Sequence, residues 1–190
     1  MSDPPRTGHA PISMKDHKIV FTGTPGSGKS TAIASLSDTT PITTHKPATD
    51  AGPADQLLRI SLDVGQIDLG NGHGHSVKLI STPGHPRFAS MWRTITTDAL
   101  GLVILIDNAR PAPWDDLAMY LDAYKELLPT MNCVVGIGRT AEHPQPSADD
   151  YGEMLAGHGL AVPVMPVDVR RRSDVLMLVE AVLVQAGMRA

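Results

Sequence analysis

The stretch GTPGSGKS, residues 23–30, matches the pattern G-x-x-x-x-G-K-[ST] without a gap and decides the fold of this chain. It follows a short β-rich run, residues 18–22, and precedes a helical pattern over 30–37. Glycines let the backbone wrap a phosphate group, so that successive N–H groups and the dipole of the following helix face its negative charge. The sequence therefore predicts a phosphate-binding loop built from Gly23, Thr24, Pro25, Gly26, Ser27, Gly28, Lys29, Ser30 and Thr31.

Two side chains of this loop carry the expected chemistry. Lys29 is placed to reach the β- and γ-phosphates of a nucleotide, and the Ser30 hydroxyl is placed to ligate Mg²⁺. We therefore expect Lys29 to act in catalysis by stabilising phosphoryl charge. Ser30 is the expected metal ligand and Mg²⁺ the expected cofactor. A glycine-rich turn with a chance lysine is the plain alternative.

The composition of the chain limits its other functions. In 190 residues, 16 Lys and Arg stand against 20 Asp and Glu, a net charge of −4 that argues against nucleic acid as a partner. Cys133 is the one cysteine, which excludes an internal disulfide framework and a multi-cysteine zinc site. The longest apolar run, 100–106, is too short to span a bilayer, and the N-terminus has no signal-peptide core. We expect a cytoplasmic protein with no membrane span.

Strand and helix signals alternate from residue 18 onward. Strands are expected over 18–22, 58–64, 76–81, 100–107, 133–137 and 162–167. Helices are expected over 30–37, 117–128, 148–156 and 175–183, with another in the segment 82–96. Only one hairpin, with its turn at 70–74, interrupts this order. The prediction is an α/β, three-layer fold with a mostly parallel six-stranded sheet and one antiparallel strand.

Two segments lack a regular pattern. Residues 1–16 contain three prolines and no apolar run, so we expect a flexible N-terminal tail followed by one domain over 17–190. Residues 38–56 are rich in Thr and Pro and show no sustained period, so we expect a long loop. A long loop inside a compact domain is usually functional or mobile.

A second motif lies at residues 79–88, which read LISTPGHPRF. A strand that ends in T-P-G-H resembles the third motif of Ras-like and translational GTPases. The resemblance implies that Gly84 contacts the γ-phosphate and that His85 orients the attacking water, a catalytic role. A Pro-Gly turn with a surface histidine is the alternative interpretation.

Further segments narrow this resemblance. They are the LDVG run at 62–65, the dipeptide Met91-Trp92 after the second motif, and the run LIDNARP at 105–111. Together they resemble the small bacterial Ras-like P-loop GTPases related to MglA, of the TRAFAC type, over residues 18 to about 186. The resemblance implies a Ras-like GTP-binding domain. It also implies a signalling or polarity switch, with a protein effector or a roadblock-type regulator as partner.

The chain departs from that family around the metal. Ser81 stands where an Asp usually precedes T-P-G, so one anchor for Mg²⁺ is missing. The switch threonine that completes Mg²⁺ coordination is also missing from its usual slot at residues 56–59. Thr43, Thr44 and Thr49 are the candidates to replace it, and the sequence does not choose among them.

The guanine-specificity box N-K-x-D is also degenerate, because residues 138–141 read GRTA. Ala141 replaces the Asp that pairs with guanine, and Glu142 is a candidate substitute. The stem of Arg139 is expected to pack on the base, and Asp168 falls in the last specificity motif. Guanine preference over adenine is therefore left open.

Other candidates have plain alternatives. His73 and His75 suggest a metal site, but two ligands in a glycine-rich turn seldom make one. The run of three arginines at 170–172 is either an anion patch or a solvated helix start. Arg87 and Arg93 are candidates to supply a charge to the γ-phosphate or to pack on the surface.

Three functions remain open at this point. The first is a GTP-binding molecular switch with slow, partner-dependent hydrolysis. The second is a pseudo-GTPase that binds partners without hydrolysis, which the degenerate box favours. The third is a small-molecule kinase, which would need a lid with arginines that the sequence does not show.

Overall fold

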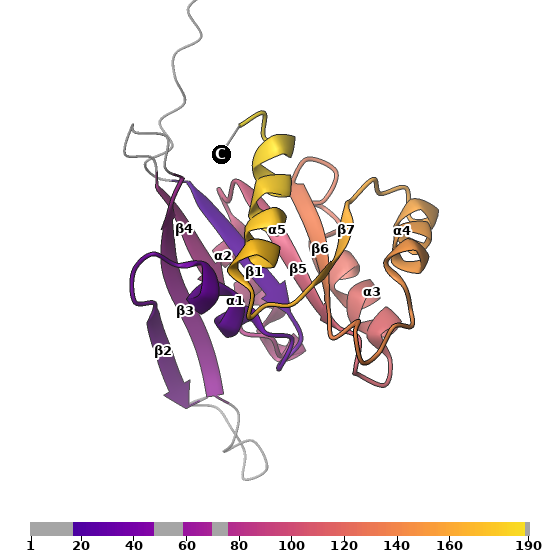
Figure 1. Ribbon diagram of the computed structural model, residues 1–190, viewed down its shortest axis with the longest axis horizontal. Coiled ribbons are helices and arrows are strands. Elements are labelled where there is room, and N and C mark those ends of the chain that lie inside the picture. Colours follow the sequence, from indigo (N-terminus) through magenta and orange to yellow (C-terminus); the bar gives the residue numbers. More distant parts are fainter. Residues whose placement is uncertain (1–16, 48–58, 70–75, 189–190) are drawn as a thin grey trace, which may run out of the picture.

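The computed structural model describes residues 17–47, 59–69 and 76–188 (Figure 1). The strands are β1 (Lys18–Gly23), β2 (Ile42–Pro47), β3 (Arg59–Asp68), β4 (Ser76–Ser81), β5 (Gly101–Asp107), β6 (Asn132–Gly138) and β7 (Val164–Val167). The helices are α1 (Lys29–Leu36), the short 3₁₀ helix η2 (Pro86–Phe88), α2 (Ala89–Thr96), α3 (Pro113–Tyr124), α4 (Ala148–Gly157) and α5 (Arg172–Gln185). The predicted tail at 1–16, and the candidates Thr49, His73 and His75, lie outside the described residues.

The strands form one sheet in the order β2-β3-β4-β1-β5-β6-β7. β4, β1, β5, β6 and β7 are parallel neighbours, whereas β3 pairs antiparallel with both β2 and β4. β3 is therefore the one described strand that runs against the others. The predicted α/β class and the mostly parallel sheet are confirmed.

The predicted count of six strands is wrong, because β2 lies inside the segment 38–56 that we expected to be a loop. β2 is an edge strand that pairs only with β3, and its residue Ile42 is 71% exposed. Polar residues are typical of such edges because they discourage pairing with other chains. The sequence ITTHKP consequently lacks the alternation that identifies a half-buried strand.

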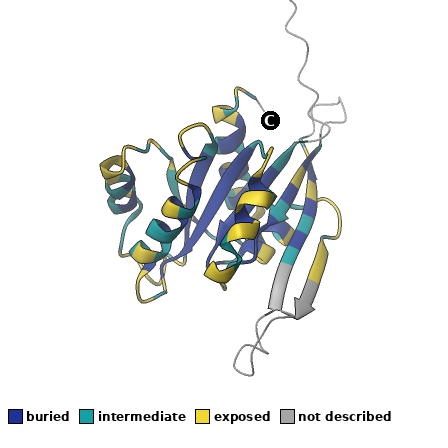
Figure 2. Ribbon diagram, turned by 180° about the vertical axis from the view of Figure 1, so that it is seen from behind, coloured by how far each residue is buried: buried dark blue, intermediate teal, exposed yellow. Residues whose placement is uncertain are grey.

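Alternate residues of the central strands face two different hydrophobic clusters. Ile19 and Phe21 of β1 belong to the cluster that includes side chains of α1 and α5, whereas Val20 belongs to the cluster that includes side chains of α2, α3 and α4. Every residue of β5 is buried, as expected for a strand covered on both faces (Figure 2). The molecule thus has three layers, helices on each side of the sheet.

The five parallel strands end at one edge of the sheet. Their last residues are Gly23, Ser81, Asp107, Gly138 and Val167. In open α/β sheets, ligands bind outside this carboxyl edge. Among the described residues, no helix is long and apolar enough to cross a membrane.

Candidate nucleotide-binding site

The phosphate-binding loop connects β1 to α1 and has the backbone shape that its glycines permit. Gly26 and Gly28 have positive φ angles of 82° and 95°, which L side chains rarely adopt. A Cβ on Gly28 would also lie 2.7 Å from Val169 Cγ2. The backbone conformation of the loop therefore depends on these two glycines.

Lys29 lies along the loop and is almost fully buried. Its ammonium donates hydrogen bonds to the Gly23 carbonyl at 2.7 Å and to the Thr24 carbonyl at 2.9 Å. Burial lowers the pKa of Lys29 to about 8, and the nearby carboxylate of Asp63 opposes part of that shift. The loop thus holds a desolvated cation next to its own carbonyl oxygens.

Two hydroxyls of the loop are buried without a hydrogen-bond partner among the described residues. They are Thr24 Oγ1 and Ser27 Oγ. A buried polar group without a partner costs roughly 1–3 kcal/mol, so native proteins leave few of them. A ligand that carries many acceptor oxygens, such as a polyphosphate, would satisfy both.

The hydroxyl of Ser30 belongs to a cluster around a carboxylate that the sequence analysis missed. Ser30 donates to Asp63 Oδ2 at 2.7 Å, Ser81 donates to the same oxygen at 2.8 Å, and Thr43 donates to Oδ1 at 2.9 Å. Asp63 is only 2% exposed. Of the three threonine candidates, the structure thus brings Thr43 to this cluster.

Asp63 was missed because of the period-two pattern of residues 58–64. It occupies one of the polar positions of that alternation, which normally face solvent. The carboxylate is buried because Ser30 of α1, Thr43 of β2 and Ser81 of β4 surround it. An acidic residue on a strand next to the motif strand was the only signal available.

Gly84 lies directly against the phosphate-binding loop. A Cβ on Gly84 would be 2.7 Å from the Gly23 carbonyl oxygen, 2.7 Å from the Pro25 nitrogen and 2.8 Å from Lys29 Nζ. Trp92 Nε1 donates to the Pro83 carbonyl at 2.5 Å, and the Tyr120 hydroxyl donates to the Gly84 carbonyl at 2.9 Å. The T-P-G segment is therefore held at the phosphate end by α2 and α3.

The side chain of His85, which follows Gly84, contacts residues of the short helix η2 that it precedes. Its Nδ1 accepts a hydrogen bond from the Arg87 backbone N–H at 3.3 Å, and its ring meets Phe88 edge-on at 6.4 Å between centroids. The guanidinium of Arg87 lies 5.2 Å from the centre of the Phe88 ring. Arg93 binds the Ala123 carbonyl and Glu126 near α3 instead of the phosphate end.

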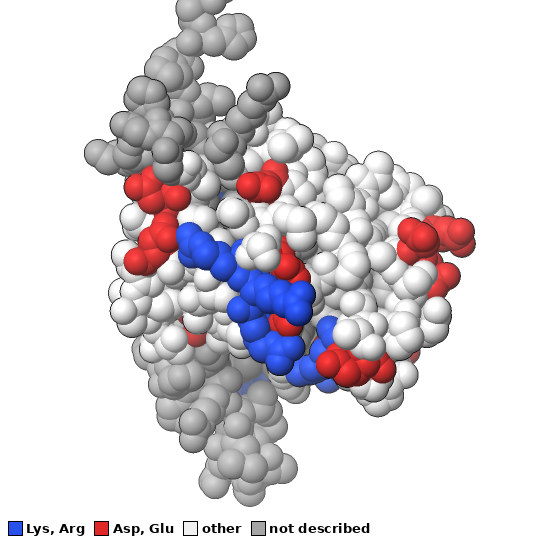
Figure 3. Space-filling model, in the orientation of Figure 1, with Lys and Arg blue, Asp and Glu red and all other residues white. Residues whose placement is uncertain are grey.

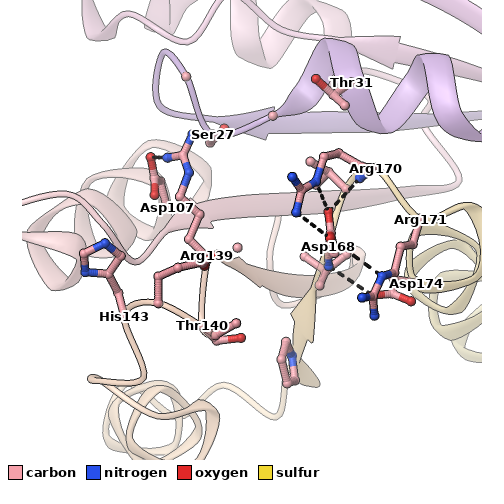
Figure 4. Close-up of a pocket in the computed structure, with 18 residues that line it drawn as sticks. Ser27, Thr31, Asp107, Arg139, Thr140, His143, Asp168, Arg170, Arg171 and Asp174 are labelled. Carbon is pink, nitrogen blue, oxygen red and sulfur yellow. Dashed lines mark hydrogen bonds and ion pairs between the residues drawn. The ribbon is translucent and has the colours of Figure 1, made fainter.

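A pocket of about 700 Å³ extends from the phosphate-binding loop to the ends of β6 and β7 (Figure 4). That volume is within the range of small-molecule sites. Arg139 and Asp168 both line it, as does Ala141. The guanidinium of Arg139 forms an ion pair with Asp107, at the end of β5.

Asp168 presents a fixed negative charge to this pocket. Arg170 donates two hydrogen bonds to its carboxylate, both 2.8 Å long, and Asp174 accepts one from its backbone N–H at 3.0 Å. The hydrogen bonds from Arg170 lower the pKa of Asp168 to about 2. Its side chain is therefore an ionised acceptor at neutral pH.

The three arginines at 170–172 have different environments. Arg170 and Arg171 line the pocket, whereas Arg172 binds the Leu36 carbonyl at the end of α1 and Asp38. Figure 3 shows Lys and Arg side chains gathered in a band on this face, with acidic groups beside them.

Cys133 is buried, which raises the pKa of its thiol to about 12 and fits an inert core residue.

A parallel sheet with a phosphate-binding loop at its carboxyl edge, and with a T-P-G segment against that loop, defines a P-loop nucleotide-binding domain. The chain belongs to the family of 50S ribosome-binding GTPases, whose model matches residues 18–135. It is thus a P-loop GTPase domain that binds guanine nucleotide, and its family suggests hydrolysis of the triphosphate. The match ends before Arg139.

Solved structures of the cytosolic part of the iron transporter FeoB share the fold. The T. maritima domain in its GMPPNP form is 16% identical with a TM-score of 0.60, and the match covers 92% of this chain and 67% of that one. The L. pneumophila domain is 14% identical with a TM-score of 0.58, and the covered shares are 89% and 68%. A GDP-bound mutant of S. thermophilus NFeoB is 12% identical with a TM-score of 0.61, and the shares are 92% and 61%. Comparison with curated protein sequences found no match.

Proposed function

We propose that the protein is a GTP-dependent switch that hydrolyses GTP slowly and uses two segments, 38–56 and 82–96, to present its nucleotide state to a partner. The observation that carries this proposal is the contact of Gly84 with both the phosphate-binding loop and Lys29. A γ-phosphate bound beside Lys29 would meet the T-P-G segment directly. The presence of that phosphate then determines where the segment lies.

Lys29 and the loop amides are the proposed phosphate-binding groups. The ammonium donates hydrogen bonds to the carbonyls of Gly23 and Thr24, within the loop that would surround the β-phosphate. Electrostatic stabilisation of the transferred phosphoryl group is the main catalytic contribution expected of such a site. The unpartnered hydroxyls of Thr24 and Ser27 support the placement of the phosphates here.

The residues beside Ser30 fit Mg²⁺. This ion prefers oxygen ligands and usually binds proteins through one or two carboxylates, phosphates and water. Ser30 supplies a hydroxyl next to the loop, and Thr43 supplies another 2.9 Å from the same buried carboxylate. Among the described residues no cluster of three His, Cys, Asp or Glu exists. When bound, Mg²⁺ would neutralise charge on the phosphates.

His85 is the proposed residue that positions water. Its Nδ1 already accepts from Arg87, so Nε2 is the atom left to hold a water molecule beside Gly84. Arg93 is engaged with α3, and the arginines that line the pocket lie at its base end. Hydrolysis should therefore be slow unless a partner protein contributes a cation.

Asp168 is the proposed reader of the guanine base in place of the residue that Ala141 replaces. Guanine offers two donors on one edge, and an ionised carboxylate accepts both, whereas adenine presents an acceptor there. The stem of Arg139 is proposed to pack on the base. Glu142 also lines the pocket and is the competing candidate.

The cellular role is proposed from sequence resemblance. Likeness to MglA-related GTPases suggests signalling or cell polarity in the cytoplasm, with a roadblock-type regulator or another effector as partner. The switch would be the domain at 17–190. A pseudo-GTPase that only binds nucleotide is the second candidate, and the degenerate base box together with the bonded Nδ1 of His85 favours it.

Nucleotide titrations followed by phosphate release test this proposal. We expect GTP and GDP to bind with Mg²⁺, ATP to bind more weakly, and phosphate release to be slow and to fall further in His85→Ala. Exposed His158 provides the matched control, His158→Ala. Equal affinity for ATP and GTP would contradict the proposal that the switch is specific for GTP. Phosphate release that is absent even with cell extract supports the pseudo-GTPase, and transfer of phosphate to a metabolite supports a kinase.

A further inference from the structure

Two aromatic side chains bind the backbone of the T-P-G segment from neighbouring helices. Trp92 of α2 donates its indole N–H to the Pro83 carbonyl, and Tyr120 of α3 donates its hydroxyl to the Gly84 carbonyl at 2.9 Å. Both side chains are buried in the hydrophobic cluster that includes residues of α2, α3 and α4. Two consecutive carbonyls of one short segment are therefore each bound by a side chain from the core.

The two rings also fix each other in place. Their centroids lie 4.7 Å apart with 31° between the ring planes, and Trp92 stacks on Tyr124 of α3 at 6.3 Å. Burial raises the pKa of the Tyr120 hydroxyl, so this group stays protonated and remains a donor. Side chains in a close-packed core keep well-defined rotamers, so both donors have a fixed direction.

The direction of the two carbonyls decides where the neighbouring N–H groups point. The Pro83 carbonyl and the Gly84 N–H belong to one planar peptide unit, in which C=O and N–H point in opposite directions. With this carbonyl turned to Trp92, the Gly84 N–H points away from that ring. The phosphate-binding loop lies close to Gly84 on a side that the rings leave open, because a Cβ there would be 2.7 Å from the Gly23 carbonyl oxygen and 2.8 Å from Lys29 Nζ.

We propose that Trp92 and Tyr120 are positioning residues for recognition of the γ-phosphate, and that they orient the Gly84 N–H toward the phosphate-binding loop by binding the Pro83 and Gly84 carbonyls. We call this pair of rings the aromatic latch. The proposal rests on the proposed function, because it takes the γ-phosphate to bind beside Lys29. GDP has no phosphate at that place, so the aromatic latch contributes to the affinity for GTP and not to the affinity for GDP.

A purely structural role is the alternative, because both side chains lie in the core. Loss of a buried hydrogen bond would then lower the stability of the protein and leave the relative affinity for GTP and GDP unchanged. The ratio of the two affinities distinguishes the alternatives, since a loss of stability that is common to both nucleotide complexes cancels in it.

The test measures the affinity of the whole protein for GDP and for a non-hydrolysable GTP analogue by calorimetric titration with Mg²⁺. In Tyr120→Phe, which removes only a hydroxyl, we expect the affinity for the analogue to fall about fivefold and the affinity for GDP to change by less than about twofold. Trp92→Phe, which removes the indole N–H, should change the ratio in the same direction. Tyr124→Phe is the matched control, because this tyrosine is also buried in α3 but its hydroxyl binds Thr22. Its ratio should equal that of the wild type.

Tryptophan fluorescence gives a second measurement of the aromatic latch. The chain has two tryptophans, so Trp114→Phe leaves Trp92 as its one indole fluorophore. We expect the emission of Trp92 to differ between the GDP complex and the analogue complex, because its N–H is bound to the segment that would meet the γ-phosphate. Addition of Tyr120→Phe to this protein should reduce the difference. If a variant of the aromatic latch fails to fold, the Trp114→Phe protein carries the test, and equal emission in the two complexes overturns the proposal.

The outcomes separate this proposal from the proposed function. An unchanged ratio of affinities in folded Tyr120→Phe and Trp92→Phe assigns both rings to packing and overturns the aromatic latch, while GTP binding stands. A fall in the ratio of the control Tyr124→Phe as large as that of Tyr120→Phe also overturns it, because the effect would not depend on the Gly84 carbonyl. A wild-type protein that binds no nucleotide at all overturns the proposed function and this proposal with it.

Discussion

At the phosphate end of the pocket the proposed site is formed mainly by backbone groups, whereas at the proposed base end it is formed by side chains. The phosphate end depends on Gly26 and Gly28, whose φ angles are positive, and on carbonyls that hold Lys29. The proposed base end offers Arg139, paired with Asp107, and Asp168, bound by Arg170. The first set occurs in one continuous motif, and the second is gathered from the end of β5 and from the loops after β6 and β7.

The difference teaches how each end tolerates change. A backbone site needs particular glycines at fixed positions, so its motif stays recognisable. A side-chain site for a base needs only a hydrogen-bond acceptor and a planar cation, such as a guanidinium, close to the base. Residues at different positions in the sequence can supply these two groups. The base box is therefore degenerate in sequence while the pocket still presents an ionised carboxylate at Asp168.

Removal of the Lys29 ammonium should have the largest effect. We expect Lys29→Met to weaken GTP binding about 100-fold or more, because the charge that meets the phosphates is lost. The nucleotide-free protein should become more stable by roughly 1 to 3 kcal/mol at pH 7, because a buried cation with a lowered pKa destabilises the fold. Calorimetric titration and thermal unfolding measure the two effects. Lys125→Met is the exposed control, and a loss of stability in Lys29→Met would contradict the burial argument.

Gly84→Ala tests the contact between the T-P-G segment and the loop. The added Cβ would meet the Gly23 carbonyl, the Pro25 nitrogen and Lys29 Nζ, so we expect the segment to move away at a cost of about 1–3 kcal/mol in the free energy of unfolding. The ratio of GTP to GDP affinity should fall about tenfold. Gly152→Ala in α4, where nothing lies within 4 Å, is the matched control. An unchanged ratio would separate Gly84 from γ-phosphate sensing.

The pKa of Lys29 predicts the pH dependence of binding. The free protein releases the Lys29 proton near pH 8, and bound phosphate holds that proton. Affinity for GTP should therefore be constant just below pH 8 and fall by up to about tenfold per pH unit above it. The stability of the nucleotide-free protein should change with pH in the opposite direction. It should rise as pH increases through 8, because the cost of the buried charge declines there. Lys29→Met should show neither dependence, and a flat wild-type profile up to pH 9.5 would contradict the lowered pKa.

The base end should give the smallest changes. We expect Asp168→Asn to weaken GTP several-fold and to leave ATP unchanged, because the neutral amide accepts less strongly from the guanine donors. Competition of both nucleotides against a fluorescent GDP measures the ratio. The same measurement on Glu142→Gln distinguishes the competing candidate. If that variant alone changes the ratio, Glu142 reads the base instead of Asp168.

The parts of the molecule that could be predicted are those with a local cause. The continuous apolar run of β5 and the phosphate-binding loop are each visible in a few adjacent residues. β2 could not be predicted, because its polar sequence forms a strand only by pairing with β3. Asp63 could not be predicted either, since its burial depends on Ser30 and Thr43, far from it in the chain.

The sequence by itself determined that this protein has an α/β fold with a phosphate-binding loop, because the spacing of glycines around Gly28 and Lys29 has a backbone meaning that needs no distant partner. It also determined which strand ends in the T-P-G segment. Only the tertiary structure decided which residues surround Asp63 and which residues line the pocket. Those residues meet across the carboxyl edge of the sheet, where strand order rather than sequence order makes neighbours of Asp63, Ser81 and Ser30.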